Sequence, residues 1–225
     1  MRSTVGQLRV EGGKLGVFVA ATLLLVAVAG CRHWLEQDMA RHMLIEFPLL
    51  LVVGAALAWA TGGATRGLLA RCNALGLSGF AFVTLTLAYW MIPAALDASV
   101  RQGGVGGAKW LTLLASGYVL PASFGLATLP VQALMVGNVA WMSAAVGLLY
   151  QQADRQLCLY YLADAQVVAG QGLVAAAVII GLAWCLWAVR RADRGHRQPH
   201  HGPEPARSEL LVRARISGLP GATIE

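Results

Sequence analysis

Four side chains with metal-binding or acid–base chemistry recur at helical spacing just before a long apolar run. Read as a helix, the segment places them at the i, i+3, i+4 and i+7 positions of one face: Met39, His42, Met43 and Glu46. Two thioethers and an imidazole favour copper, above all Cu(I), over magnesium or calcium. The same face also suits a helix end whose methionines pack against neighbouring helices. The spacing therefore leaves a metal site and simple packing as equal alternatives.

The apolar runs that must position these side chains are long enough to cross a membrane. The 225 residues are 57% hydrophobic and 12% charged, with a mean hydropathy of +0.62. A span of roughly 20 apolar residues crosses a bilayer as a helix. Such runs occur at 15–30, 44–61, 77–98, 108–127, 131–150 and 167–189. Because they are continuous rather than alternating, they predict helices and exclude a closed barrel.

These runs predict one domain and a tail. Residues 1–190 are expected to form an all-α bundle of about six transmembrane helices, kinked at Pro93 and Pro121. Small residues such as Gly170 and Gly172 on the last span predict close contact between helices. Residues 191–225, rich in Gly, Pro, His and Arg at their start, read as a disordered, basic cytoplasmic tail.

Arginine and lysine orient the predicted bundle. Positive charge is densest in the N-terminal segment, the second loop and the C-terminal flank, and cytoplasmic segments carry such an excess. We therefore predict that both termini are cytoplasmic. The outer face then receives the Met39 to Glu46 segment and the ends of two further spans, which carry Trp90, Met91, Asp97, Asp164 and Gln166.

Each of these boundary residues has a plain explanation beside a functional one. Trp90 suits an aromatic belt, Asp164 suits a helix N-terminus, and Asp97 suits a solvated helix end. The functional interpretation makes Met91 a fourth ligand beside Met39, His42 and Met43. It gives Glu46 and the remaining boundary residues a supporting or docking role around the metal.

The cysteines and the missing motifs narrow the chemistry further. Cys31 and Cys158 are predicted outside, where they could pair, offer a thiolate or stay as buried thiols. Cys72 and Cys185 are predicted on the cytoplasmic side. The sequence has no C-x-x-C, P-loop, G-x-S-x-G or H-E-x-x-H motif, so we expect neither an enzyme nor a nucleic-acid partner. Residues 28–31 resemble a lipoprotein box, but we expect the first span to be retained.

Three segments resemble motifs of the CtaG-like cytochrome c oxidase assembly proteins. His42-Met43 followed by Pro48 and Gly54 looks like the histidine-methionine then proline-leucine-glycine segment of that family. Residues 89–97 and 161–170 are similar to two further membrane-boundary motifs. The resemblance implies a multi-pass inner-membrane protein whose His and Met residues face the periplasm and hand copper to a haem-copper oxidase. Its implied partners are membrane lipid and an oxidase subunit or copper chaperone.

Two other classes of function stay open beside a transient Cu(I) handler. A transporter of a small solute or a metal would line a path with Tyr118, Gln132 and Asn138, near the kink at Pro121. A structural anchor of a respiratory complex would need no ligands. The absence of a visible internal repeat and the scarcity of charge within the spans favour the assembly factor over the transporter.

Overall fold

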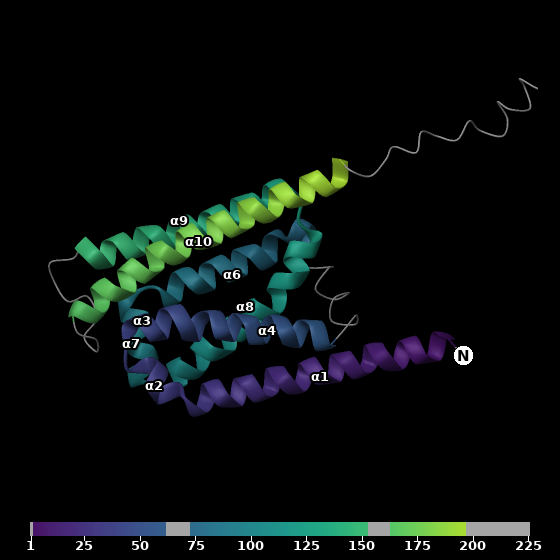
Figure 1. Ribbon diagram of the computed structural model, residues 1–225. Helices are drawn as coiled ribbons and strands as arrows, with labels where there is room; N and C mark the ends of the chain where they lie inside the picture. Colours follow the sequence, from purple (N-terminus) through teal and green to yellow (C-terminus); the bar gives the residue numbers. More distant parts are fainter. Residues whose placement is uncertain (1, 62–72, 153–162, 197–225) are drawn as a thin grey trace, which may run out of the picture. The chain divides into compact units, whose positions relative to one another are not determined.

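The computed structural model describes residues 2–61, 73–152 and 163–196, which form helices joined by short turns, with no strand among them (Figure 1). This confirms the all-α prediction. In chain order the elements are α1 (Arg2–Gly30), α2 (Arg32–Glu36), α3 (Met39–Arg41), the π-helical η1 (His42–Glu46), α4 (Phe47–Thr61), the 3-10 helix η2 (Ala74–Gly76), α6 (Leu77–Trp90), α7 (Pro93–Arg101), α8 (Gly103–Leu126), α9 (Leu129–Gln152) and α10 (Ala163–His196).

The chain divides into two compact units, Met1–Cys185 and Leu186–Glu225. The described part of the second unit is the end of α10, where the Arg191 guanidinium lies 5.3 Å from the Trp187 ring centroid. This helix continues to His196, past the bundle end predicted at residue 190. The remainder of the predicted tail lies outside the described residues, as do Cys72 and Cys158. The packing and the site described below belong to the first unit.

Among the described residues, four helical stretches are long and apolar enough to span a membrane: Gly12–Gly30, Met39–Thr61, Leu129–Gln152 and Asp164–Asp193. The pair Ala74–Trp90 and Pro93–Arg101 would supply a fifth, but it bends by 77° at its break. Helix α8 is absent from this group, because its glycine-rich start and Lys109 dilute its apolar character. The structure thus supports a multi-pass membrane protein with four or five spans, where the sequence predicted about six.

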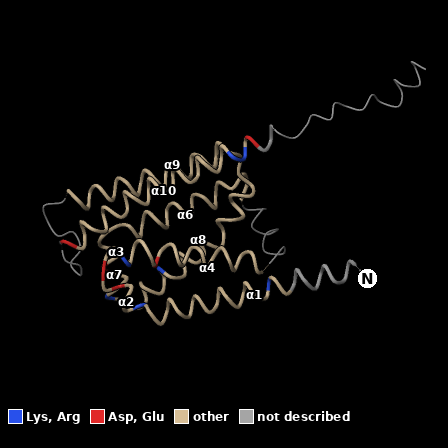
Figure 2. The backbone as a smooth tube through the Cα atoms, in the orientation of Figure 1, with Lys and Arg blue, Asp and Glu red and all other residues tan. Residues whose placement is uncertain are grey.

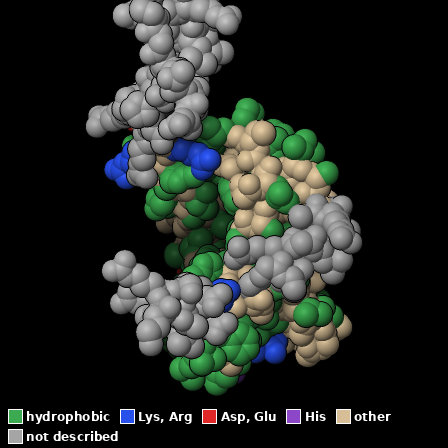
Figure 3. All heavy atoms as spheres, turned by 90° about the vertical axis from the view of Figure 1, so that its right-hand side faces the viewer, with side chains coloured by type: hydrophobic (Ala, Val, Ile, Leu, Met, Phe, Trp, Pro, Cys, Tyr) green, Lys and Arg blue, Asp and Glu red, His purple; other side chains and the backbone are tan. Residues whose placement is uncertain are grey.

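Charged residues gather at a few places in these helices. Figure 2 shows acidic and basic residues around α2, α3 and α7 and again at the C-terminal end of α10, where Arg190, Arg191 and Asp193 lie, with few along the rest of the long helices. The space-filling view of one face shows apolar side chains interspersed with backbone and uncharged groups, and only a few basic side chains (Figure 3). A surface of this kind suits lipid contact, so the few charges at the α2, α3 and α7 end need a separate explanation.

Close backbone contact holds α4 against α8. A Cβ atom on Gly54 would meet the Leu114 carbonyl oxygen and lie 2.8 Å from the Tyr118 nitrogen. A Cβ atom on Gly117 would meet the Leu51 carbonyl oxygen from the other side. Small residues allow such approach between membrane helices. This crossing fixes the start of α4 relative to the start of α8.

Two predicted features of the later helices are confirmed. A Cβ atom on Gly170 would lie 2.5 Å from the Gly147 carbonyl oxygen, so α9 and α10 approach closely through small residues. Pro93 ends the third predicted span, because Ile92 before it takes an extended conformation with φ −73° and ψ 126°, as residues before proline do. Pro121 lies inside α8, which continues through it.

The break between α6 and α7 is held by a hydrogen bond from α9. The fully buried Tyr150 hydroxyl donates to the Met91 carbonyl oxygen at 2.7 Å. Tyr150→Phe should therefore lower the free energy of unfolding by about 1–2 kcal/mol, because it removes the donor from a buried carbonyl. Thermal unfolding in detergent micelles measures the loss. Tyr89→Phe, on an exposed ring, is the control and should change stability little; equal effects of the two variants would contradict the role given to Tyr150.

Candidate functional site

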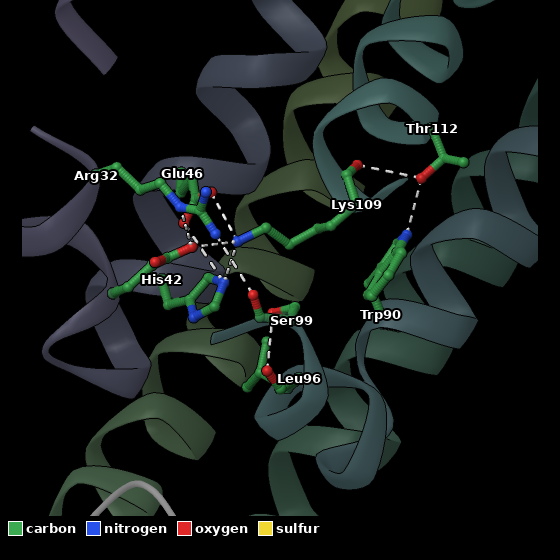
Figure 4. A network of polar contacts seen from close by, with 9 residues as sticks. Arg32, His42, Glu46, Trp90, Leu96, Ser99, Lys109 and Thr112 are labelled. Carbon is green, nitrogen blue, oxygen red and sulfur yellow. Dashed lines mark hydrogen bonds and ion pairs between the residues drawn. The ribbon is translucent and has the colours of Figure 1, made fainter. Parts of the chain in front are cut away.

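The charged end of the bundle contains an ammonium group surrounded by three acceptors. Lys109 projects from α8 toward the end of α2 and the π-helical segment, as Figure 4 shows. Its Nζ lies 2.9 Å from Glu36 Oε1, 2.8 Å from Glu46 Oε1 and 2.6 Å from His42 Nε2. Of the three N–H donors of the ammonium, two are used in hydrogen bonds to Glu36 Oε1 and His42 Nε2, whereas Glu46 is an ion-pair partner only. The Lys109 hydrogen bond makes His42 Nε2 an acceptor, which is the neutral form of the ring.

A second cation closes the cluster on its more exposed side. Arg32 Nε donates to Glu36 Oε1 at 2.9 Å, the same oxygen that Lys109 contacts. Arg32 Nη2 donates to the Ser99 carbonyl oxygen at 3.4 Å, which ties α2 to α7. A Cβ atom on Gly106 would meet the Arg32 guanidinium, so glycine leaves room for it at the start of α8. The side chains become less accessible inward, from 35% exposed for Arg32 to 10% for Glu36 and 0% for Lys109.

Local sequence explains why His42 and Glu46 face each other. Asp38 caps α3 by accepting from the Ala40 N–H at 2.8 Å, and a single π-helical segment then covers His42–Glu46. Pro48 has no N–H for the Leu44 carbonyl, and the wider turn lies just before it. The predicted α-helical face is thus wrong in detail over this segment. His42 Nε2 and Glu46 Oε2 nevertheless lie 3.4 Å apart, and π-helical turns are frequent at functional sites.

Glu46 is the least satisfied member of the cluster. Its side chain is completely buried, and neither of its oxygens receives a hydrogen bond of good geometry from the described residues. The 2.8 Å approach of the Lys109 ammonium is an ion pair of short distance and poor alignment. A buried carboxylate is costly unless a cation compensates it. Glu46 therefore depends on Lys109, and its open oxygens mark a place where a better-aligned cation would be stabilised.

Formal charge within the cluster is balanced. Two cations, Arg32 and Lys109, face two carboxylates, Glu36 and Glu46, around the neutral His42 ring. Ionisable groups within membrane segments are rare and usually functional, because burial in hydrocarbon opposes them. The balance explains how these charges are tolerated. It also predicts that a change of one charge alone disturbs the cluster strongly.

The structure brings the predicted metal ligands into one core but gives His42 oxygen neighbours. Met39, His42 and Met43 are buried, and Met39, Met43 and Met91 belong to one apolar core. The ligand atoms that gather with the imidazole are the carboxylate oxygens of Glu36 and Glu46, and these three groups lie within 4.8 Å of one another. One imidazole and two carboxylates suit a divalent transition metal such as Zn²⁺ or Cu²⁺, whereas Cu(I) prefers the sulfur ligands that the methionines offer. Lys109 already fills the space between them.

The other predicted residues have separate positions. Trp90 is buried and its Nε1 donates to Thr112 Oγ1 at 2.9 Å; that hydroxyl lies 2.8 Å from the Ala108 carbonyl oxygen and 3.1 Å from the Lys109 carbonyl oxygen and donates to this pair (Figure 4). Trp90 thus supports the helical turn that carries Lys109 rather than standing in an interfacial belt. Asp97 is buried on α7. Asp164 is exposed in the first turn of α10, while Gln166 is buried and donates to the Tyr150 carbonyl oxygen at 3.0 Å.

Sequence reasoning missed three members of the cluster: Arg32, Glu36 and Lys109. Arg32 and Lys109 lie in segments that the predicted topology places outside, and neither they nor Glu36 were given a role in the site. One signal was present, since Lys109 is one of only two lysines in the chain and stands among glycines and apolar residues. A lysine there in place of the far commoner arginine is consistent with a compact ammonium being needed.

Comparison with known proteins adds no relative. No protein-family model, curated protein or solved structure matches this chain.

Proposed function

We propose that this protein is a membrane-bound assembly factor that holds a copper ion transiently at His42 and passes it to a partner. The observation that carries the proposal is the meeting of His42, Glu36 and Glu46 at one buried point of a membrane-type bundle. Met39 and Met43 flank His42 in the same segment and are buried with it. Imidazole and thioether side chains are ligands that copper accepts.

The ligands of this cluster suit a metal ion that is bound and released rather than held permanently. The cluster already satisfies its charge through Lys109, so it does not require a resident metal to be stable. A copper ion would have to displace the Lys109 ammonium from His42 Nε2, which lies only 2.6 Å away. Reversible displacement favours transient holding over permanent coordination.

Two parts of the proposal, the identity of the partner and the side of the membrane, are based on the resemblance to the CtaG-like proteins. That resemblance lies in the segments that contain His42, Trp90 and Gln166. On that basis we propose a haem-copper oxidase subunit or a copper chaperone as the partner. We place the cluster at the periplasmic face of a bacterial inner membrane, with both termini in the cytoplasm. The proposed protein catalyses no reaction. Its role is to hold and release the ion.

Cu(I) binding to the purified protein in detergent tests the proposal. A variant combining Met39→Leu, His42→Ala and Met43→Leu should bind Cu(I) about tenfold more weakly or worse, because it lacks the imidazole and both thioethers. Competition with a chromogenic Cu(I) chelator measures the affinity. The matched control combines His33→Ala with Met142→Leu, which removes the same ligand types outside the buried cluster. Equal affinity of the two variants would refute a copper site at His42.

The His42→Ala single variant also tests the proposed client. In the cell it should lower the copper content of the haem-copper oxidase, while an immunoblot of the protein itself stays unchanged. Normal oxidase copper in cells that contain the folded variant would remove the assembly role even if copper binding holds in vitro.

The three residues named for a transporter path lie in separate places among the described residues. Gln132 donates to the carbonyl oxygens of Phe124 and Ala127 at 2.9 and 3.1 Å, where it joins the end of α8 to α9. The Tyr118 hydroxyl lies 2.7 Å from Thr61 Oγ1. Asn138 is exposed beside an open apolar groove of about 460 Å³. These positions serve helix packing rather than one continuous polar path.

A further inference from the structure

We infer that Lys109 is a built-in competitor for the metal site, a tethered cation that occupies the position a metal ion would take among Glu36, His42 and Glu46. The inference rests on the proposed function for its biological role, because it explains how a bound ion is released. It concerns d-block cations as a class, with Zn²⁺ as the divalent probe and Cu(I) as the proposed cargo.

The geometry carries the inference. The three groups that could hold a metal place their ligand atoms within 4.8 Å of one another. The Lys109 ammonium approaches all three, at 2.9 Å from Glu36, 2.8 Å from Glu46 and 2.6 Å from His42. Figure 4 shows this side chain reaching from α8 into the space between the other groups. A metal and the ammonium therefore cannot occupy this point together.

The unsatisfied oxygens of Glu46 are a second and independent observation. Both are buried, and neither accepts a well-aligned hydrogen bond from the described residues. An ammonium at the end of a long flexible side chain satisfies charge without fixed geometry. A metal ion would form short, directed bonds to the same oxygens. The Glu46 oxygens can therefore bind a metal ion in better geometry than they bind the Lys109 ammonium.

Charge decides how strongly Lys109 opposes the metal. The cluster is neutral, with Arg32 and Lys109 against Glu36 and Glu46. A divalent ion that binds with the ammonium still nearby raises the net charge of the cluster from 0 to +2. When a neutral residue replaces Lys109, the empty cluster has a net charge of −1, and the same ion raises it only to +1. In a poorly solvated site this difference is large. The exchange forms metal bonds to Glu36, His42 and Glu46 while the ammonium withdraws on its own side chain, with no covalent or redox step.

The test is Zn²⁺ and Cu(I) affinity of Lys109 variants in detergent. Lys109→Gln and Lys109→Met should each bind Zn²⁺ at least about tenfold more tightly than the unaltered protein, because each removes a competing charge. Lys109→Arg keeps a permanent cation and is the matched control, for which no gain is expected. Adding His42→Ala or Glu46→Gln to Lys109→Gln should abolish the gain. A cobalt absorption spectrum of Lys109→Gln should show d–d bands that are lost in the same double variants.

Two results would overturn the inference. One is a folded Lys109→Gln or Lys109→Met protein that binds Zn²⁺ no better than the unaltered protein. The other is a gain that survives the loss of His42 and Glu46. If neither variant is monodisperse without metal, expression in zinc-supplemented medium should restore it, and failure to do so counts against the inference. Loss of Cu(I) binding to the unaltered protein would refute the proposed function alone, since the lysine variants report the competition separately.

Discussion

Replacing Lys109 by methionine should lower the free energy of unfolding by about 3–5 kcal/mol in metal-free buffer, the usual consequence of removing one partner of a buried ion pair. The reason is Glu46, which is completely buried and has the Lys109 ammonium 2.8 Å from Oε1. Without the lysine, this carboxylate stays in the core with no lysine or arginine of the described residues in an ion pair with it. Thermal unfolding in detergent micelles, followed by size-exclusion chromatography, measures the loss.

A charge-balanced double variant separates electrostatics from packing. Lys109→Met combined with Glu46→Gln removes one cation and one carboxylate together, so it should be more stable than Lys109→Met alone although it carries one more substitution. A double-mutant cycle should give a coupling of about 1–3 kcal/mol between the two positions. If the two losses simply add, the stability of the cluster does not depend on this pair.

An exposed ion pair of the same segment provides the control for that cycle. Arg41 and Asp38 lie 3.7 Å apart with side chains 31% and 36% exposed. Arg41→Met and Asp38→Asn should show a coupling below about 1 kcal/mol, because solvent screens surface pairs. The contrast between the two cycles isolates the effect of burial.

Most of the helical framework could be predicted because it follows from local sequence. Continuous apolar runs predict membrane-type helices, and four or five of the six predicted runs correspond to such helices. The break at Pro93 could be predicted as well, since proline fixes its own φ and restricts Ile92 before it. The size of the bend, 77°, could not, because it depends on which neighbours hold the two halves. Tyr150 on α9 is one of these, and nothing near Met91 in the sequence points to it.

Only the part of the candidate site that comes from one continuous segment, His42 and Glu46, could be predicted from the sequence. His42 and Glu46 are four positions apart on one helical segment, so local structure brings them together although the turn is π-helical. Lys109 lies 67 residues from His42 and 73 from Glu36 in the sequence, and only the packing of α8 against α4 delivers its ammonium. Counted by composition, the same lysine is simply an outer positive charge. The sequence alone suggested asking which metal ion the methionines bind. With Lys109 in the cluster, the question is which metal ion can compete with its ammonium for Glu36, His42 and Glu46.

The α4 and α8 crossing carries the second prediction, because it is what sets the distance from Glu46 to Lys109. Gly117→Ala should lower the free energy of unfolding by about 1–3 kcal/mol, as overpacking of a core does. The added Cβ would meet the Leu51 carbonyl oxygen and lie 2.7 Å from the Leu51 Cα. These are backbone atoms, so no side-chain rotation relieves the contact and the helices must separate.

Gly125→Ala on the same helix is the matched control. A Cβ atom there would meet nothing within 4 Å, so alanine should be neutral or stabilise the helix by up to about 1 kcal/mol. Unfolding of both variants in the same detergent gives the comparison. A Gly117→Ala protein as stable as Gly125→Ala would show that the close approach of α4 and α8 does not occur.

Gly54→Ala extends the argument, because its Cβ would meet α8 from the opposite side, 2.9 Å from the Gly117 Cα. Once one added methyl group separates the helices, the second finds space. The Gly54→Ala and Gly117→Ala double variant should therefore be more stable than the sum of the two losses predicts, a coupling expected for residues in contact. The same separation moves Lys109 away from Glu46. In both single variants the coupling between Lys109 and Glu46 should fall below its value in the unaltered protein, which would tie the crossing directly to the cluster.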